Sequence, residues 1–289
     1  MLALEHGKNV LCEKAFTVNA SQARKLVETA KEKGLFLMEA VWTRYFPLSV
    51  KIRELVKSGE IGTVHRVLSD LSIPEAQDNG DLKFADEHRM VNKELAGGAL
   101  LDLGIYALTW VFQILYHCQD AQKGREKPKV TSAMNLYKTG ADEMTSIVLQ
   151  WEKENSMGIA LTSLRLEGRS DDQVQIRIQG TKGEIQVFGP AYRPLKFRVA
   201  KPGQEPEVVE FPIPVDKDRG NWGHGMFWEA DEAGRCLRDG KKESEGLGWE
   251  ESVLIMETMD EARKQGGLKY SELIETDVYD EKSPLNGSH

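Results

Sequence analysis

Residues 97–108 read GGALLDLGIYAL, and this stretch decides how the rest of the chain is interpreted. After two glycines, apolar side chains fill the faces of the predicted helix, so we expect a buried helix. Asp102 and Tyr106 interrupt this apolar surface four residues apart, which places both side chains on one helix face. A buried carboxylate and a buried phenol each need a hydrogen-bond partner. The pair is a candidate site; the alternative is a tyrosine whose hydroxyl only satisfies a neighbouring backbone group.

The composition suits a folded protein with room for about two domains. The chain has 289 residues, 40% of them hydrophobic, and a formal net charge of -8 without a cluster of Lys or Arg. This charge argues against nucleic acid and anionic membranes as partners. No apolar run approaches the roughly 20 residues of a membrane span, and the first residues lack a signal-peptide pattern. We therefore expect a soluble, cytoplasmic protein.

The cysteines and histidines suggest neither a disulfide framework nor a metal site. Cys12, Cys118 and Cys236 lie far apart and are odd in number, which favours reduced thiols in the cytosol. The six histidines show none of the spacings of a zinc site, and no HExxH motif occurs. We predict no bound metal.

A predicted βαβ unit lies near the start of the chain. Its parts are an apolar strand over 9–12, a helix over 19–33 with a good N-cap, and a second apolar strand over 35–38. Strands joined this way are parallel, with a right-handed crossover. Lys14 and Trp42 follow the two strands, so they emerge at the same carboxyl-terminal edge of the sheet. Ligands bind at that edge in open α/β sheets.

The remaining sequence predicts helices and a series of strands. A helix over 47–58 precedes a strand that begins at residue 63, and helices over 224–238 and 249–264 precede a polar tail. Strand-like runs follow the 97–108 helix, at 129–138, 145–152, 157–166, 173–179, 184–188, 195–200 and 207–211. Short turns between consecutive strands imply an antiparallel sheet.

The predicted fold class is α/β plus α+β. Residues 1–60 form an incomplete Rossmann-like parallel sheet, with part of the C-terminal helices packed back on it. Residues 61–275 form a larger domain with an open antiparallel sheet and helices on one face, and 276–289 are a polar tail. A doubly wound nucleotide domain normally starts with a strand, a G-x-G-x-x-G turn and a helix, and this chain has no such turn near its start. We expect it to open in the middle of such a domain.

Three stretches together resemble the glucose-fructose oxidoreductase/inositol dehydrogenase (Gfo/Idh/MocA) family. They are HGKNVLCEK at 6–14, EAVWTR at 39–44, and the 97–106 stretch some ninety residues after the lysine. The segments GMFWEADEA at 225–233 and WEES at 249–252 are similar to the fungal branch of this family, the sugar dehydrogenases. The resemblance covers nearly all of the chain from residue 5 to residue 274.

The resemblance implies a reacting centre made of Lys14, Asp102 and Tyr106. Tyr106 would be the general acid/base at the hydroxyl or carbonyl carbon, and Lys14 would hold the nicotinamide ribose. An ammonium beside a phenol favours the phenolate, so Lys14 would also lower the pKa of Tyr106. Asp102 would orient the pair.

The resemblance also implies a cofactor, a substrate class and an assembly. Glu13, Lys14 and Arg44 would contact the cofactor, which is expected to be NADP, with NAD as the alternative. Trp42 and Tyr106 would line the pocket for a sugar such as D-xylose or for a dihydrodiol. Ordinary packing and an ion pair are an equal alternative for Trp42 and Arg44. Related dehydrogenases dimerise through the open sheet face, so we expect a homodimer.

The chain departs from the family pattern in two places. Ala15 stands where the family has proline after Glu-Lys, which loosens the turn without removing the lysine. The Gly-rich turn that holds the pyrophosphate is not found, so we expect these 289 residues alone to bind NADPH weakly and to turn over no substrate. An oxidoreductase is favoured, and a non-catalytic sensor or scaffold on the same fold is the alternative.

Overall fold

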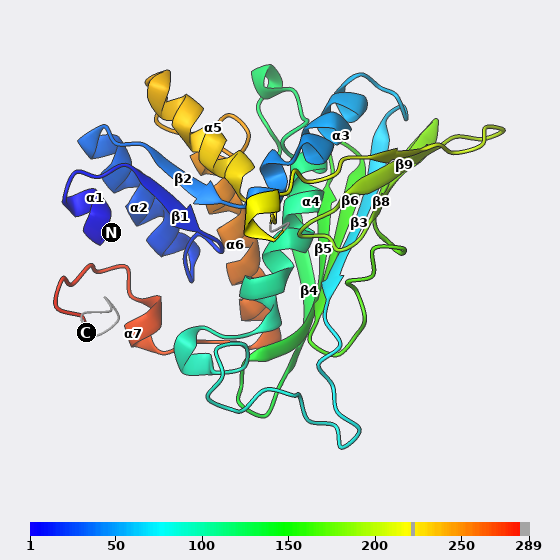
Figure 1. The fold of residues 1–289 in the computed structure, drawn as a ribbon. Coiled ribbons are helices and arrows are strands. Elements are labelled where there is room, and N and C mark those ends of the chain that lie inside the picture. The colour runs from blue at the N-terminus through cyan, green and yellow to red at the C-terminus, as the bar shows by residue number, and fades with distance from the viewer. Residues whose placement is uncertain (221–222, 284–289) are drawn as a thin grey trace.

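The computed structural model describes residues 1–220 and 223–283. Two sheets organise them: a two-stranded parallel sheet near the N-terminus and an eight-stranded sheet in the larger part (Figure 1). The first part contains α1 (Leu2–Glu5), β1 (Val10–Glu13), α2 (Ala20–Lys33) and β2 (Leu37–Ala40). The turn η1 (Trp42–Tyr45) and helix α3 (Pro47–Lys57) lead into the larger part.

The βαβ unit is confirmed. β1 and β2 pair in parallel, with Val10 opposite Leu37. The side chain of Asn19 caps α2 by accepting a hydrogen bond from the Gln22 amide at 2.9 Å, and Gly34 ends the helix in the left-handed conformation, with φ of 63°. The loops that follow β1 and β2 therefore leave the sheet at one edge.

The larger sheet has the strand order β10-β9-β8-β7-β3-β6-β5-β4. All its neighbouring strands are antiparallel except β3 and β6, which are parallel. This parallel pair departs from the expectation of an antiparallel sheet, because the chain crosses over through α4 between β3 and the later strands. The strands are β3 (Val64–Ser72), β4 (Lys129–Leu136), β5 (Asp142–Trp151), β6 (Ser156–Ser163), β7 (Val174–Gly180), β8 (Gly183–Phe188), β9 (Lys196–Ala200) and β10 (Val208–Glu210).

Helices cover one face of this sheet, as predicted. A π-helical turn, η3 (Leu100–Gly104), continues into α4 (Ile105–Leu115), in which every residue is buried. α4 packs on β3 and β6, and α6 (Trp249–Gly266) packs on β4 (Figure 1). The other helical elements are η2 (Lys93–Leu95), η4 (Ala121–Lys123), η5 (Lys217–Arg219), α5 (Phe227–Arg238) and α7 (Glu272–Glu275).

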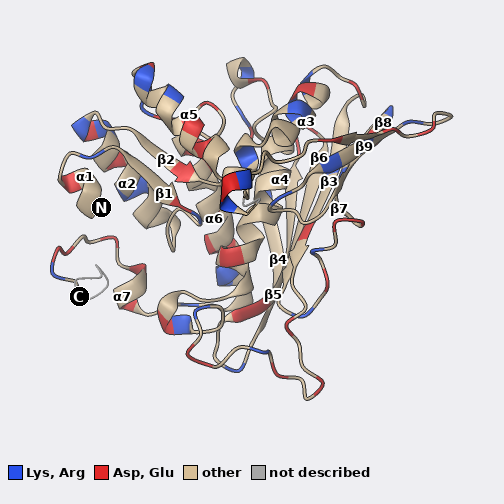
Figure 2. Cartoon of the chain, viewed as in Figure 1, with Lys and Arg blue, Asp and Glu red and all other residues tan. Residues whose placement is uncertain are grey.

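One helical stretch in the described residues, Lys93–Leu115, is long and apolar enough to cross a membrane. The sequence had suggested no such run. Its 18-residue window is 83% buried inside the protein, so it is the core helix of the larger part. Lys and Arg are interspersed with Asp and Glu over the helices and loops (Figure 2).

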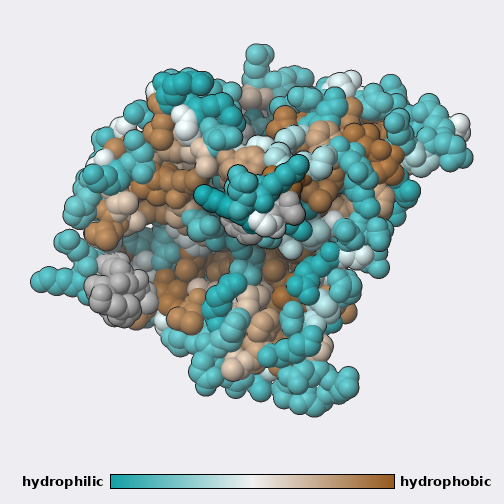
Figure 3. Space-filling view, viewed as in Figure 1, coloured by the Kyte–Doolittle hydropathy of each residue, from teal (hydrophilic) through white to brown (hydrophobic). Residues whose placement is uncertain are grey.

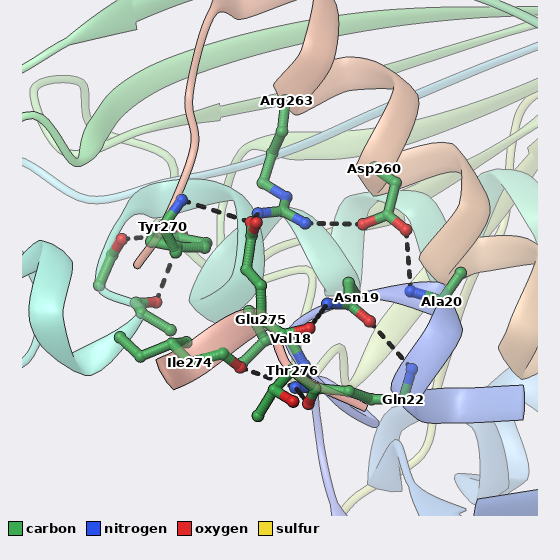
Figure 4. A network of polar contacts seen from close by, with 12 residues as sticks. Val18, Asn19, Ala20, Gln22, Asp260, Arg263, Tyr270, Ile274, Glu275 and Thr276 are labelled. Carbon is green, nitrogen blue, oxygen red and sulfur yellow. Dashed lines mark hydrogen bonds and ion pairs between the residues drawn. The ribbon is translucent and has the colours of Figure 1, made fainter. Parts of the chain in front are cut away.

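The C-terminal helices bind the first part to the larger one. The carboxylate of Asp260 on α6 accepts a hydrogen bond from the Ala20 amide at 2.8 Å, and the Asn19 amide side chain donates to the Glu275 carbonyl at 2.9 Å. Arg263 joins these contacts through ion pairs of 2.8 Å to Asp260 and 2.6 Å to Glu275 (Figure 4). The start of α2 is thereby fixed against α6 and α7. Residues 284–289 of the predicted polar tail lie outside the described residues.

Candidate active site

Lys14, Asp102 and Tyr106 meet although they come from separate segments. The Nζ of Lys14 donates to the Asp102 carbonyl oxygen at 2.7 Å and to its Oδ1 at 3.0 Å. The same ammonium lies 5.0 Å from the centre of the Tyr106 ring. Lys14 reaches this position from the edge where β1 ends, while Asp102 lies in η3 and Tyr106 in the first turn of α4. A π-helical turn at this point is itself frequent at functional sites.

Trp42 contacts the tyrosine hydroxyl directly. Its indole Nε1 donates a hydrogen bond of 2.6 Å to the Tyr106 hydroxyl oxygen. The ring of Tyr192 lies 5.9 Å from each of the two rings, so the three aromatic rings form one cluster. Sequence reasoning missed Tyr192, since a tyrosine between β8 and β9 carries no local signal of this contact.

Burial controls the ionisation of Tyr106. The side chain is 7% exposed, and burial raises the pKa of its phenol; the hydrogen bond from Trp42 opposes this rise. The sequence had suggested that Lys14 lowers this pKa. In the structure the ammonium lies over the ring and is paired with Asp102, so its charge is already compensated.

Asp102 is held as a carboxylate between two cations. Burial alone would raise the pKa of Asp102, but Lys14 and Arg89 together hold it below its ordinary value. The Nη1 of Arg89 lies 3.2 Å from the same Oδ1 that Lys14 contacts. Arg89 is largely exposed and was not singled out in the sequence.

A cavity of about 390 Å³ adjoins this cluster. Residues 95–98, Lys14, Arg89 and Asp102 line part of it. Gly98 has φ of 137°, and an added Cβ there would collide with the Asp142 carboxylate. An added Cβ at Gly97 would meet the Arg89 and Asn92 carbonyl oxygens, so close packing of the chain requires both glycines.

Asp142 on β5 fixes the start of the helical segment. Its Oδ2 accepts hydrogen bonds from the Leu100 amide at 2.8 Å and from the Thr145 hydroxyl at 2.9 Å. The side chain is fully buried, which raises its pKa to about 6. This carboxylate caps the segment that carries Asp102 and Tyr106, and so sets its position.

The two other predicted cofactor contacts lie in different surroundings. Glu13 is exposed at the end of β1, next to Lys14. Arg44 is fully buried: its Nη2 forms an ion pair of 2.6 Å with Glu251, and its Nε donates to the Gly246 carbonyl at 2.8 Å. The structure thus places Arg44 in the core and not with Lys14.

Three cysteines in the described residues are free thiols. Within residues 1–220 and 223–283, no group of three His, Cys, Asp or Glu side chains is arranged to hold a metal ion.

Apolar residues gather around the centre of one face, between the first sheet and the larger sheet, and hydrophilic residues cover its rim (Figure 3).

The parallel βαβ unit presents a lysine after its first strand, and the adjoining sheet domain supplies an aspartate and a tyrosine. This arrangement is that of a two-part oxidoreductase. Two family models match the chain: "Oxidoreductase family, NAD-binding Rossmann fold" over residues 1–41 and "GFO/IDH/MocA C-terminal domain" over residues 49–186. The chain belongs to the Gfo/Idh/MocA oxidoreductase family, as the three sequence stretches had suggested.

Curated relatives share this family. D-xylose 1-dehydrogenase (NADP(+)) of Hypocrea jecorina is 64% identical over 289 residues, an alignment that covers 99% of this chain and 74% of the relative. Trans-1,2-dihydrobenzene-1,2-diol dehydrogenase of Homo sapiens is 34% identical over 273 residues, covering 93% of this chain and 74% of the relative.

Solved structures share the fold. Aldose-aldose oxidoreductase from Caulobacter crescentus, complexed with glycerol, matches with a TM-score of 0.72 at 18% identity, covering 92% of this chain and 72% of that one. The 3-ketoreductase KijD10 from Actinomadura kijaniata, in complex with NADP, matches with a TM-score of 0.68 at 19% identity, covering 91% and 72%.

Proposed function

We propose that this protein is an NADP-dependent dehydrogenase that oxidises D-xylose, or a closely related sugar or vicinal diol. The observation that carries the proposal is the cluster of Lys14, Asp102 and Tyr106 at the carboxyl edge of the parallel strands. The names of the two curated relatives support the cofactor and substrate classes, since one names D-xylose and NADP(+) and the other a dihydrodiol.

Tyr106 is the proposed acid/base. Because burial raises its pKa, the phenol is protonated at neutral pH and can donate its proton when a carbonyl is reduced. In the oxidation direction it accepts the proton of the substrate hydroxyl, and the hydrogen bond from Trp42 stabilises the phenolate that must form first. Trp42 is also proposed to line the substrate pocket, because it contacts the Tyr106 hydroxyl.

The residues around the cavity suit a nicotinamide cofactor. Lys14 is proposed to bind the nicotinamide ribose, Glu13 to contact it from the end of β1, and Asp102 to hold the lysine in place. Residues 97–98 line the same cavity as Lys14 and Asp102. When bound, NADP supplies the hydride acceptor. Arg44 forms a buried ion pair with Glu251, so we assign it no cofactor contact.

The experiment that tests this function compares two tyrosine variants. In a form of the protein that oxidises D-xylose, Tyr106→Phe removes the proposed acid/base and keeps the ring, so turnover should fall about 100-fold or more. Tyr192→Phe is the matched control, because its ring packs on Tyr106 and no chemistry is assigned to its hydroxyl. NADPH formation is followed by absorbance. Wild-type turnover in Tyr106→Phe would remove the assignment. If a form of the protein that includes a Gly-rich nucleotide-binding turn oxidises neither D-xylose nor a trans-dihydrodiol, the proposed activity is removed.

A homodimer through the open sheet face is also proposed. One row across this face runs through Val148, Ile159 and Leu68 on β5, β6 and β3, and continues through Arg177 on β7. The three apolar side chains are only partly buried, while the opposite face packs on the helices. Light scattering should give twice 32.5 kDa. Ile159→Lys should yield the monomer mass, and a wild-type mass of 32.5 kDa at micromolar concentration would refute the dimer.

Domain bounds and location are part of the proposal. We assign residues 1–60 to the dinucleotide-binding part, 61–275 to the substrate and dimerisation part, and 276–289 to a tail. The free cysteines support a reducing, cytoplasmic location.

A further inference from the structure

Glu229 is a buried acid that the proposed chemistry does not use. It lies in the first turn of α5, is 7% exposed, and its Oε2 has no hydrogen-bond partner among the described residues. A carboxylate without partners is costly to bury, so the neutral acid is favoured. Burial, with the charge of Glu13 added, raises the pKa of Glu229 to about 8.

The position of Glu229 is next to the candidate active site. α5 packs against η1, the turn that carries Trp42. The neighbouring ring of Trp228 lies 4.8 Å from Phe46, which in turn lies 5.5 Å from the ring of Trp42. A chain of aromatic contacts thus joins the start of α5 to the residue that hydrogen-bonds Tyr106.

The charge of Glu229 also acts on Tyr106. A negative charge on Glu229 raises the pKa of Tyr106, as do the charges of Asp102 and Glu13, after the larger effect of burial. The ionisable groups that act on this region are thus Glu13 at the end of β1, Lys14 paired with Asp102, and Tyr106 on α4. Glu229 lies on α5.

We propose that Glu229 is a substrate-binding residue that hydrogen-bonds a hydroxyl of the sugar or diol other than the one that reacts. The inference rests on the proposed function and adds to it a residue that selects polyhydroxy substrates. A neutral carboxyl offers one donor and acceptor lone pairs, and a hydroxyl group offers the same complement. A ligand without that hydroxyl would leave the buried carboxyl unpaired, so the binding of such a ligand is disfavoured.

The test is a binding titration that does not depend on the cofactor. Trp42 and Trp228 adjoin the site, so D-xylose is titrated against intrinsic tryptophan fluorescence with the unaltered chain and with three variants. Glu229→Gln retains a donor and an acceptor, while Glu229→Leu retains neither. Asp231→Leu is the matched control, because Asp231 is exposed on the same helix.

Glu229→Leu should weaken D-xylose binding about tenfold, and Glu229→Gln and Asp231→Leu should bind like the unaltered chain. Above about pH 8 the unaltered chain should bind more weakly as Glu229 ionises, and Glu229→Gln should not. Circular dichroism confirms that each variant is folded.

Two outcomes overturn the inference, and they are told apart by the titration and by an enzyme assay of a form that includes a Gly-rich nucleotide-binding turn. If the unaltered chain and Glu229→Leu bind D-xylose equally well, Glu229 contacts no substrate hydroxyl and the proposed function stands. If the unaltered chain binds no sugar or dihydrodiol and the form with the Gly-rich turn oxidises none, the proposed function fails and takes this inference with it.

Discussion

The indole Nε1 of Trp42 lies 2.6 Å from the hydroxyl oxygen of Tyr106 and donates a hydrogen bond to it. Donation to this oxygen favours the phenolate, against the burial that raises the pKa of Tyr106. Trp42, which follows β2, therefore changes the acidity of Tyr106 on α4, in the larger part of the chain.

The first prediction concerns this hydrogen bond. Trp42→Phe keeps an aromatic wall and removes the donor, so the pKa of Tyr106 should rise further. The rate of D-xylose oxidation should then reach its maximum at a higher pH, and it should fall about tenfold at neutral pH. The pH–rate profile measures both effects. An unchanged profile would show that the indole donor has no part in the ionisation of Tyr106.

The second prediction concerns the glycine at the start of the active-site helix. Gly98→Ala forces an L side chain into φ of 137° and against the Asp142 carboxylate. We expect a loss of about 3 kcal/mol in the free energy of unfolding. Gly80→Ala is the control, since Gly80 also has a positive φ of 87° but open space around it, and should lose about 1 kcal/mol. Equal losses in urea denaturation would mean that the approach of Asp142 does not matter.

The third prediction is a pH dependence of stability. Glu39 at the end of β2 is 2% exposed, and burial raises its pKa from 4.5 to about 7. Between these values the folded protein binds a proton that the unfolded chain has released, so the Glu39 contribution to stability falls as pH rises. It is fully present below pH 4.5 and lost by about pH 7.

Glu39→Gln should remove this component and retain an acceptor for the Phe16 amide, which Glu39 binds at 3.0 Å. The stability of the variant relative to wild type should therefore rise with pH, by about 3 kcal/mol at most. Urea midpoints at several pH values measure it, with Glu28→Gln on the exposed face of α2 as control. A pH-independent difference would contradict the raised pKa.

The fourth prediction concerns the buried pair of Arg44 and Glu251. Glu251→Leu removes the ion-pair partner of buried Arg44 and should cost about 3 to 5 kcal/mol. Arg44→Met leaves Glu251 with His117, which lies 3.0 Å from its Oε2, and should cost less. The double variant should lose less than the sum of the two single losses. Urea denaturation of all four proteins completes the cycle. Strict additivity would show that the two charges do not depend on each other.

Local patterns in the sequence were enough to predict the βαβ unit, because an N-cap such as Asn19 and the apolar periodicity act within a few residues. The buried helix was predicted for the same reason. The parallel pairing of β3 with β6 was not predicted, since it depends on contacts between segments about ninety residues apart, such as Leu68 and Ile159.

The site was predicted less completely than the fold. Lys14 and Tyr106 were selected through a family resemblance, and the structure brings them together. Arg44 looked equally suitable in the sequence, because its partner Glu251 lies 207 residues away and leaves no local signal. Tyr192 was missed for the same reason, since only the folded chain brings its ring to Tyr106. Glu229 was also missed, because its burial depends on the packing of α5 against η1.

The contacts of the active site join segments that are remote along the chain, with Lys14 and Asp102 separated by 88 residues and Trp42 and Tyr106 by 64. Closing such long loops costs chain entropy that only extensive native packing repays. A folding intermediate that has not yet formed most of the core therefore cannot hold these side chains together. Recovery of enzyme activity during refolding should therefore follow the slowest phase of core formation, and any early compact state should be inactive.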